Sequence, residues 1–179
     1  MNESEFLTAV LSSGRIEGRT ALQKLTYFAS LKIGLKLGYI PHYYGPYSPK
    51  VAGALQNLDS LGFVREDARW TQREHRIYRY SLTDDGKVVL DKVERTYPRE
   101  CQRIQRVVSS CISIVGNNTE ALAVAAKVHY ILNKEGKTIS QNSVRKIASK
   151  FGWNLSKEDI DSGAKLLQAL GFVKTTKAK

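Results

Sequence analysis

Amide, hydroxyl and cationic side chains recur between residues 48 and 60 at a spacing that places them on one face of a helix. Glutamine and asparagine can each make two hydrogen bonds with adenine, lysine can reach guanine or a phosphate, and glycine lets the backbone approach closely. The free N–H groups at the start of such a helix can also bind a phosphate. We therefore predict contacts with duplex DNA from Ser48, Lys50, Gly53, Gln56, Asn57 and Ser60.

Arginine is the second residue type that indicates a polyanionic partner. Five arginines fall within fifteen residues, at positions 65, 69, 73, 76 and 79, and such clusters suit contacts with phosphates or the minor groove. We predict that Arg69, Arg73 and Arg76 grip the DNA backbone. Three acidic residues in the same segment offset part of the charge, so a solvated hairpin tip with internal ion pairs stays the alternative. Trp70 could lie exposed for stacking, but we expect it to fold back on the hairpin.

A helix and two strands must hold these side chains in place. Ser48 and Pro49 make a good helix start, because serine can cap the free N–H groups and proline has no N–H to leave unpaired. Gly62 ends the helix. Its apolar face consists of Val51, Leu55, Leu58 and Leu61. Strands are predicted over residues 63–67 and 76–82, with a polar tip between them.

Two further helices are predicted ahead of this unit, over residues 3–12 and 20–34, with Thr20 as the cap of the second. The order helix, helix, turn, helix, strand, polar loop, strand is that of a winged helix-turn-helix unit, whose last helix enters the major groove. Helices are also predicted over residues 84–96, 99–115, 120–133, 140–151 and 156–170.

The predicted fold class is mostly α with a small β-hairpin wing. A winged helix-turn-helix domain is expected at residues 1–96 and a helical domain at residues 97–179. The second domain is either plainly helical or a degenerate, wingless second helix-turn-helix.

Two segments of the chain read alike, which is the basis for a second unit. Residues 53–64 are GALQNLDSLGFV and residues 163–173 are GAKLLQALGFV, so each predicts a helix that stops at glycine and leads into an apolar strand. The acids near the start of the second helix, Glu158, Asp159 and Asp161, would repel a phosphate backbone. We predict that this unit serves packing or protein contact, although Leu-Gly-Phe-Val is also a common helix stop.

The net charge of +11 on 179 residues favours a polyanionic partner. The charge is uneven, because residues 1–95 carry 14 Lys and Arg against 11 Asp and Glu, whereas residues 96–179 carry 14 against 6. The more basic half is therefore not the half with the predicted DNA-reading helix. Its basic groups could still touch a nucleic-acid backbone without specificity.

The composition gives no sign of export or of a membrane segment. Acids stand where a secretory signal would carry lysines, and no apolar run approaches the ~18 residues of a membrane helix. Cys101 and Cys111 lie ten residues apart in one predicted helix, which separates them by ~15 Å, too far for a disulfide. These features predict a cytoplasmic protein that does not contact membranes.

No residue pattern indicates catalysis or a cofactor. The three histidines, His42, His75 and His129, are far apart, and no HExxH or paired-cysteine spacing for a metal occurs. No glycine-rich loop has the lysine–serine ending of a P-loop. We therefore expect no enzyme activity, no metal and no cofactor.

Two short motifs resemble a known family. TALQKLTYFA followed by YYGPYSPKV resembles the YwgA-type family and the related Panacea (SocA-like antitoxin) domain, in which an LQKL.Y helix precedes a YGPYS turn. The matching residues are Leu22, Gln23, Lys24, Leu25, Tyr27, Tyr44, Gly45, Pro46, Tyr47 and Ser48. The segments YSPKVAGALQNLDSLGFV and RIYRYSLTDDGKVVLDKV also resemble winged-helix regulators of the PadR and MarR sort. The resemblance covers residues 18–93 and implies a winged-helix fold, which serves in DNA binding, in antitoxins and in protein-binding adaptors.

The function expected from these features is that of a DNA-binding winged-helix protein, a transcriptional regulator that binds double-stranded DNA. The alternative is a protein-interaction module, such as an antitoxin or adaptor, that binds a protein partner and not DNA. The apolar face predicted within residues 99–115 could form a homodimer, since two-fold regulators bind paired half-sites. It could equally join the cores of the two domains.

Overall fold

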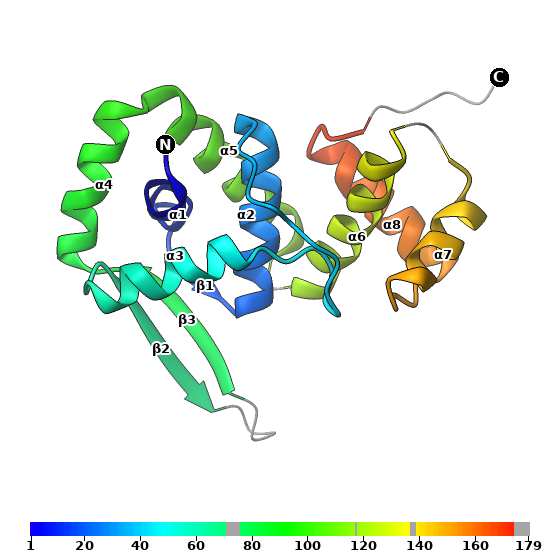
Figure 1. The fold of residues 1–179 in the computed structure, drawn as a ribbon, viewed down its shortest axis with the longest axis horizontal. Helices are drawn as coiled ribbons and strands as arrows, with labels where there is room; N and C mark the ends of the chain where they lie inside the picture. Colours follow the sequence, from blue (N-terminus) through cyan, green and yellow to red (C-terminus); the bar gives the residue numbers. More distant parts are fainter. Residues whose placement is uncertain (71–75, 117, 137–138, 174–179) are drawn as a thin grey trace.

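Helices make up most of the chain, and a small antiparallel sheet lies beside the N-terminal helices (Figure 1). The computed structural model describes residues 1–70, 76–116, 118–136 and 139–173. Its elements in chain order are α1 (Glu3–Leu11), β1 (Ile16–Glu17), α2 (Arg19–Ile33), α3 (Pro49–Ser60), β2 (Val64–Trp70), β3 (Arg76–Leu82), α4 (Asp84–Thr96), α5 (Pro98–Val115), α6 (Thr119–Glu135), α7 (Gln141–Lys150) and α8 (Lys157–Ala169). The prediction of a mostly helical protein with a small β-hairpin is confirmed.

The sheet has the strand order β1-β3-β2, and both pairings are antiparallel. Strands β2 and β3 pair from Val64↔Leu82 to Trp70↔Arg76, and their hairpin projects away from the helices (Figure 1). Strand β1 was not predicted, because two residues are too few to show an alternating pattern. A helix, a short strand, two helices and a hairpin in this order fit a winged-helix-like arrangement.

The start of α3 follows the predicted capping, whereas the start of α2 departs from it. Ser48 accepts a hydrogen bond from the Val51 amide at the start of α3, and Thr83 accepts one from the Gly86 amide at the start of α4. The prediction that Thr20 caps α2 was wrong, because this helix begins at Arg19, directly after Gly18. Gly18 has a φ of 93°, which only glycine adopts readily, and its N–H donates to the Tyr78 carbonyl at 2.7 Å. The start of α2 is thereby tied to the sheet.

Helix α5 completes the core of the N-terminal helices. Its buried face is formed by Cys101, Ile104, Val107, Val108 and Cys111, and the helix packs mainly against α2 and α1. Both cysteines are free, as their spacing predicted. Helices of the same chain therefore cover this apolar face. Most of its packing is with α1 and α2, which lie within residues 1–96.

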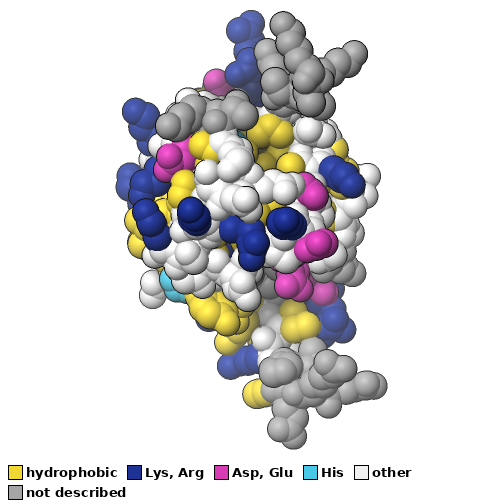
Figure 2. Space-filling view, turned by 90° about the vertical axis from the view of Figure 1, so that its right-hand side faces the viewer, with side chains coloured by type: hydrophobic (Ala, Val, Ile, Leu, Met, Phe, Trp, Pro, Cys, Tyr) yellow, Lys and Arg dark blue, Asp and Glu magenta, His cyan; other side chains and the backbone are white. Residues whose placement is uncertain are grey.

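The other end of the molecule consists of α6, α7 and α8 (Figure 1). Helix α6 packs against both α8 and α2, so that α2 contacts both ends of the molecule. Seen from this end, Lys and Arg side chains lie across the surface with Asp and Glu beside them (Figure 2). Ser156 caps α8 in a capping box with Asp159.

The two similar sequence segments form the same helix ending. Both Gly62 and Gly171 are left-handed, with φ values of 73° and 69°. In each case the amide of the following phenylalanine donates to a leucine carbonyl five residues earlier, at 2.9 and 2.8 Å. After Gly62 the chain enters β2, but after Gly171 it forms a bend and no strand through Val173. The repeat therefore encodes a helix stop, and the predicted second strand is wrong.

Candidate nucleic-acid interface

Helix α3 turns its predicted contact residues toward solvent. Val51, Ala54 and Leu58 are buried, and the exposed face carries Lys50, Gly53, Gln56, Asn57 and Ser60. Leu61 was wrongly placed on the buried face. It is 65% exposed, because the helix ends at Ser60 and Leu61 already belongs to the turn at its end.

Ser48 does not share this surface, which corrects its predicted contact with DNA. The residue is fully buried. Its hydroxyl donates to the Leu37 carbonyl at 2.6 Å and accepts from the Val51 amide at 3.3 Å. Ser48 therefore caps α3 and fastens the preceding segment to it, and neither role leaves its hydroxyl available to a ligand.

Two consecutive residues of α2, Gln23 and Lys24, hold the segment that leads into α3. The Gln23 amide pairs with the backbone of Ser48, since its Oε1 accepts from the Ser48 N–H at 2.9 Å and its Nε2 donates to the Ser48 carbonyl at 3.2 Å. Lys24 Nζ donates to the Pro46 carbonyl at 2.8 Å. Both side chains are buried. The LQKL and YGPYS motifs are thus two parts of one contact.

Burial has a marked effect on Lys24. Loss of water around its ammonium group, together with the smaller effect of the positive charge of Lys127, lowers the pKa of Lys24 to about 7. Gly45 sits directly against this group with a φ of 99°, and a Cβ at that position would lie 3.3 Å from Lys24 Cε and 3.1 Å from Lys127 Cγ. The sequence pattern gave no sign of these contacts beyond the presence of the two motifs, since lysine and glutamine usually lie at the surface.

Three arginines of the hairpin contact neighbours in the sheet. Arg69 and Arg79 both pair with Glu17, at 3.7 and 2.6 Å. The Arg76 guanidinium lies 5.2 Å from the centre of the Tyr78 ring, and its residue is exposed. Arg73, the third arginine expected to grip the DNA backbone, falls outside the described residues.

Trp70 is 69% exposed at the end of β2, so the expectation that it folds back on the hairpin was wrong. As the last residue of β2, it pairs with Arg76 in the sheet register. Its indole ring is thus an exposed aromatic group beside the arginines of the hairpin.

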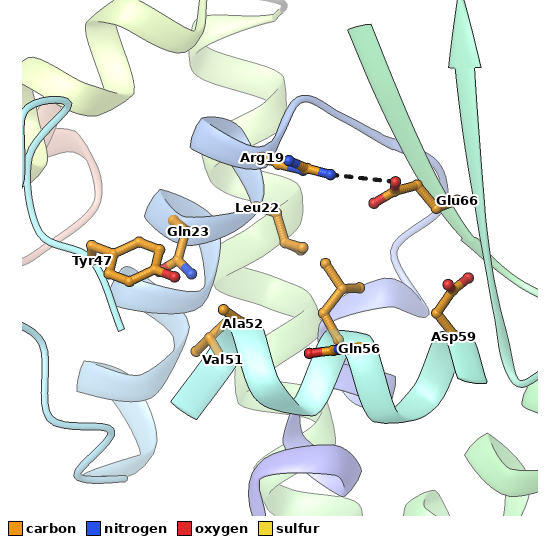
Figure 3. Close-up of a pocket in the computed structure, with 10 residues that line it drawn as sticks. Arg19, Leu22, Gln23, Tyr47, Val51, Ala52, Gln56, Asp59 and Glu66 are labelled. Atoms are coloured by element: carbon orange, nitrogen blue, oxygen red, sulfur yellow. Dashed lines mark hydrogen bonds and ion pairs between the residues drawn. The ribbon is translucent and has the colours of Figure 1, made fainter. Parts of the chain in front are cut away.

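A pocket of about 380 Å³ lies between α2, α3 and β2, beside the exposed face of α3 (Figure 3). Gln56 and Asp59 of α3 line it, opposite Arg19 of α2 and Glu66 of β2. Arg19 Nη2 pairs with Glu66 at 3.4 Å, and Arg19 Nε donates to the Tyr80 hydroxyl at 3.2 Å. The carboxylates of Asp59 and Glu66 give the pocket a mixed charge. The number of arginines in the sequence did not indicate this.

The buried histidine of α6 serves packing between helices. His129 Nδ1 lies 2.9 Å from the Tyr27 hydroxyl of α2 in a hydrogen bond. Burial lowers the pKa of His129 to about 4, with Lys32 adding to the effect, so the ring is neutral at pH 7. Within the described part of the chain, no three His, Cys, Asp or Glu side chains come together in a way that could hold a metal ion.

These features define a mostly helical protein in which a small sheet and an exposed helix form one continuous surface. No family model matches the chain. The chain is similar to the Bacillus subtilis (strain 168) protein named uncharacterized protein YwgA, with 37% identity over 87 residues. The matched part is 48% of this chain and 52% of that protein, so the chain spans about half the length of this relative. The similarity supports the predicted likeness to YwgA-type proteins.

Across residues 1–70, 76–116, 118–136 and 139–173, no helix combines the length and the apolar composition that crossing a membrane requires.

Proposed function

We propose that the protein is a winged-helix DNA-binding protein that acts as a transcriptional regulator. Helix α3 would enter the major groove, and the β2–β3 hairpin would contact the backbone or the minor groove. The observation that carries the proposal is the uncovered position of Gln56 and Asn57, next to a hairpin rich in arginine. Both side chains can make paired hydrogen bonds with adenine.

The rigidity of α3 supports this role. Gln23 and Ser48 fix its first turn. At its other end the Thr83 hydroxyl donates to the Gly62 carbonyl at 2.7 Å, and the Thr83 amide donates to the Phe63 carbonyl at 3.0 Å. A helix held at both ends presents its side chains in one orientation, which base-specific contacts need.

The ion pairs on this surface are compatible with a phosphate ligand. Lys50 pairs with Glu3 at 3.1 Å, and Arg69 pairs with Glu17 at 3.7 Å. All four side chains are partly or largely exposed, and surface pairs of this kind contribute only about 0–1 kcal/mol. A DNA phosphate can therefore replace either carboxylate at little cost, while releasing counterions from the duplex.

The same surface also has features that favour a protein partner. Asp59, Glu66 and Asp67 lie on or beside it, and carboxylates repel a phosphate backbone. Leu61 and Trp70 are 65% and 69% exposed, and large apolar side chains of this kind are common anchors in protein interfaces. The second candidate function is therefore a protein-interaction module, such as an antitoxin or adaptor.

Binding of labelled duplexes, followed by fluorescence anisotropy at several salt concentrations, separates the two functions. After selection of a preferred sequence from a random pool, the variant Gln56→Ala/Asn57→Ala should lose preference for it, by roughly 1–3 kcal/mol per bidentate contact. Its affinity for random duplex should change little. The matched control, Gln102→Ala/Asn133→Ala, removes one exposed glutamine from α5 and one exposed asparagine from α6. It should behave as the wild type.

The absence of any duplex binding at low salt would overturn the DNA-binding proposal. Binding without any sequence preference, unchanged in the α3 variant, would remove α3 from the proposed reading role.

A further inference from the structure

A second, larger cavity shares Arg19 with the pocket beside α3. It has a volume of about 600 Å³ and lies between the β1–β3 side of the sheet and the junction of α5 with α6. This volume falls within the range of about 300–1,000 Å³ typical of small-molecule sites. We call it the arginine groove, after Arg15, Arg19, Arg69 and Arg76, which line it.

The charge of the arginine groove is strongly one-sided. Four guanidinium groups face one carboxylate among the described residues that line it, that of Glu17. Glu17 is already shared between Arg69 and Arg79, which lies just outside the groove lining. Arg19 also pairs with Glu66, which lies outside the groove lining. These two carboxylates do not neutralise five arginines, so an anion that enters the groove would relieve repulsion between like charges.

The arginines are also arranged to make directed hydrogen bonds. The Arg19 guanidinium stacks on the Tyr78 ring at 3.8 Å from its centre, and Arg76 approaches the same ring at 5.2 Å. Stacking holds the planar guanidinium group in a fixed orientation, which suits the paired recognition of phosphate oxygens. Four guanidinium groups offer more N–H donors than the Glu17 carboxylate can accept. The remaining donors can bind the oxygens of a phosphate group.

Part of the remaining lining is apolar. Ile112 of α5 is 38% exposed and borders the groove, and Leu25 and Leu122 form part of its buried wall. A ligand that fills the groove must therefore combine phosphate groups with a less polar body. A duplex cannot enter a cavity of this size, so the groove differs from the proposed DNA-binding surface.

We propose that the arginine groove binds a small organic phosphate of about nucleotide size. Its phosphates would lie among the four arginines, and its body would lie against Ile112 and the buried leucines. If the proposed DNA-binding function holds, the ligand would also compete with DNA, because Arg69 and Arg76 belong both to the groove and to the predicted backbone contacts. The site itself does not depend on that function.

Isothermal titration calorimetry of the full chain with magnesium-free ATP tests the site. Adenosine, which lacks the phosphates, and tripolyphosphate, which lacks the body, serve as comparison ligands at the same ionic strength. ATP should bind at least about tenfold more tightly than either, because only ATP meets both the arginines and the apolar wall. Arg15→Ala, which removes a groove arginine outside the predicted DNA contacts, should weaken ATP binding several-fold.

A matched pair of tryptophan substitutions distinguishes the loss of ATP binding caused by filling the groove from a loss that any tryptophan on α5 would cause. Ile112→Trp should abolish ATP binding by occupying the groove, whereas Ile114→Trp should leave it unchanged, since Ile114 is also exposed on α5 but does not line the groove. Circular dichroism establishes that both variants are folded. No heat from ATP with the wild type, or binding that tripolyphosphate matches and Ile112→Trp leaves intact, would overturn the proposal.

Competition is measured separately, by adding ATP to the protein bound to labelled duplex. ATP should release the duplex from the wild type and from Ile114→Trp, but not from Ile112→Trp. If ATP binds in the calorimeter and the duplex stays bound, the competition is refuted and the site stands. If no duplex binds at all, the DNA-binding proposal fails and the calorimetry still decides the groove.

Discussion

At the scale of single residues, Gln23 and Lys24 show most clearly what the sequence could and could not predict. Their motif was recognisable, and so was the YGPYS turn that follows it. That the two side chains are buried and bonded to Ser48 and Pro46 was not predictable, because the bonds join positions more than twenty residues apart and both residue types prefer water. The structure brings these two separate sequence motifs together in one contact.

The buried amine of Lys24 should make stability depend on pH. Its pKa is about 7 in the folded chain, against the ordinary 10.5, so between these values the unfolded chain binds more protons. The free energy of unfolding should therefore rise as the pH rises above 7. Below pH 7 Lys24 is charged in the folded chain, and the full cost of burying that charge lowers the free energy of unfolding. Urea unfolding between pH 6 and pH 9 measures this slope, and Lys24→Met should flatten it.

The variant should also be less stable than the wild type at pH 9, by about 1–3 kcal/mol, because the Pro46 carbonyl loses its donor. At pH 6 the difference should shrink, since the wild type then carries the cost of a buried charge. Lys36→Met, at an exposed lysine, should keep the wild-type slope. A Lys24→Met variant that keeps the full slope would show that another group is responsible.

Gly45 gives a second test of the same contact. Gly45→Ala should destabilise the chain by about 1–3 kcal/mol, because the new methyl group would crowd Lys24 and Lys127 in addition to straining the backbone. Gly14→Ala is the control, with a similar φ of 110° and open space among the described residues around it. Thermal unfolding should place Gly45→Ala clearly below Gly14→Ala, and equal midpoints would mean that crowding at Gly45 is negligible.

At the scale of elements, the start and end of α3 could be predicted, because each rests on local residue types, and its buried face was predicted in part. The exposed position of Gln56 and Asn57 follows from the same periodicity. The surroundings of the hairpin could not be predicted in this way. Strand β1 is too short to detect, and it supplies Glu17, which pairs with two of the arginines. The sequence shows how many arginines the hairpin carries. It does not show how much of their positive charge is free for a ligand, because that depends on partners such as Glu17.

The hairpin is tested by Arg76→Ala. If Arg76 contacts a phosphate, the substitution should weaken binding to all duplex sequences alike, several-fold, and should reduce the salt dependence of log K by about one contact. Fluorescence anisotropy of random duplex at several salt concentrations measures both quantities. Arg95→Ala removes an exposed arginine of α4 and should change neither. An unchanged salt slope in Arg76→Ala would exclude the proposed contact.

At the scale of the whole molecule, the two predicted domains share more than their sequence boundary suggests. Helix α2 packs against α5 on one side and α6 on the other, and one buried cluster includes residues from both halves. The composition predicted enough apolar residues for a core, but it could not reveal that one helix would serve both halves. This sharing favours a single cooperative unfolding transition.

Ile104→Ala tests this cooperativity from the middle of α5, where Ile104 is fully buried. The substitution should destabilise the chain by about 2–5 kcal/mol. Fluorescence of the buried Trp153, far along the chain in the α7–α8 turn, should report the same shift in midpoint as helical circular dichroism. A Trp153 transition that stays at the wild-type midpoint would mean that the C-terminal helices unfold independently.

Arg19 belongs to the lining of both the pocket beside α3 and the arginine groove. One residue thus forms part of the wall of two chambers. Any guest that draws the Arg19 guanidinium group toward itself reshapes the neighbouring chamber by the same movement. Engineering a new preference into one chamber through residue 19 would therefore alter the other, and the two can be tuned separately only through residues that line just one of them.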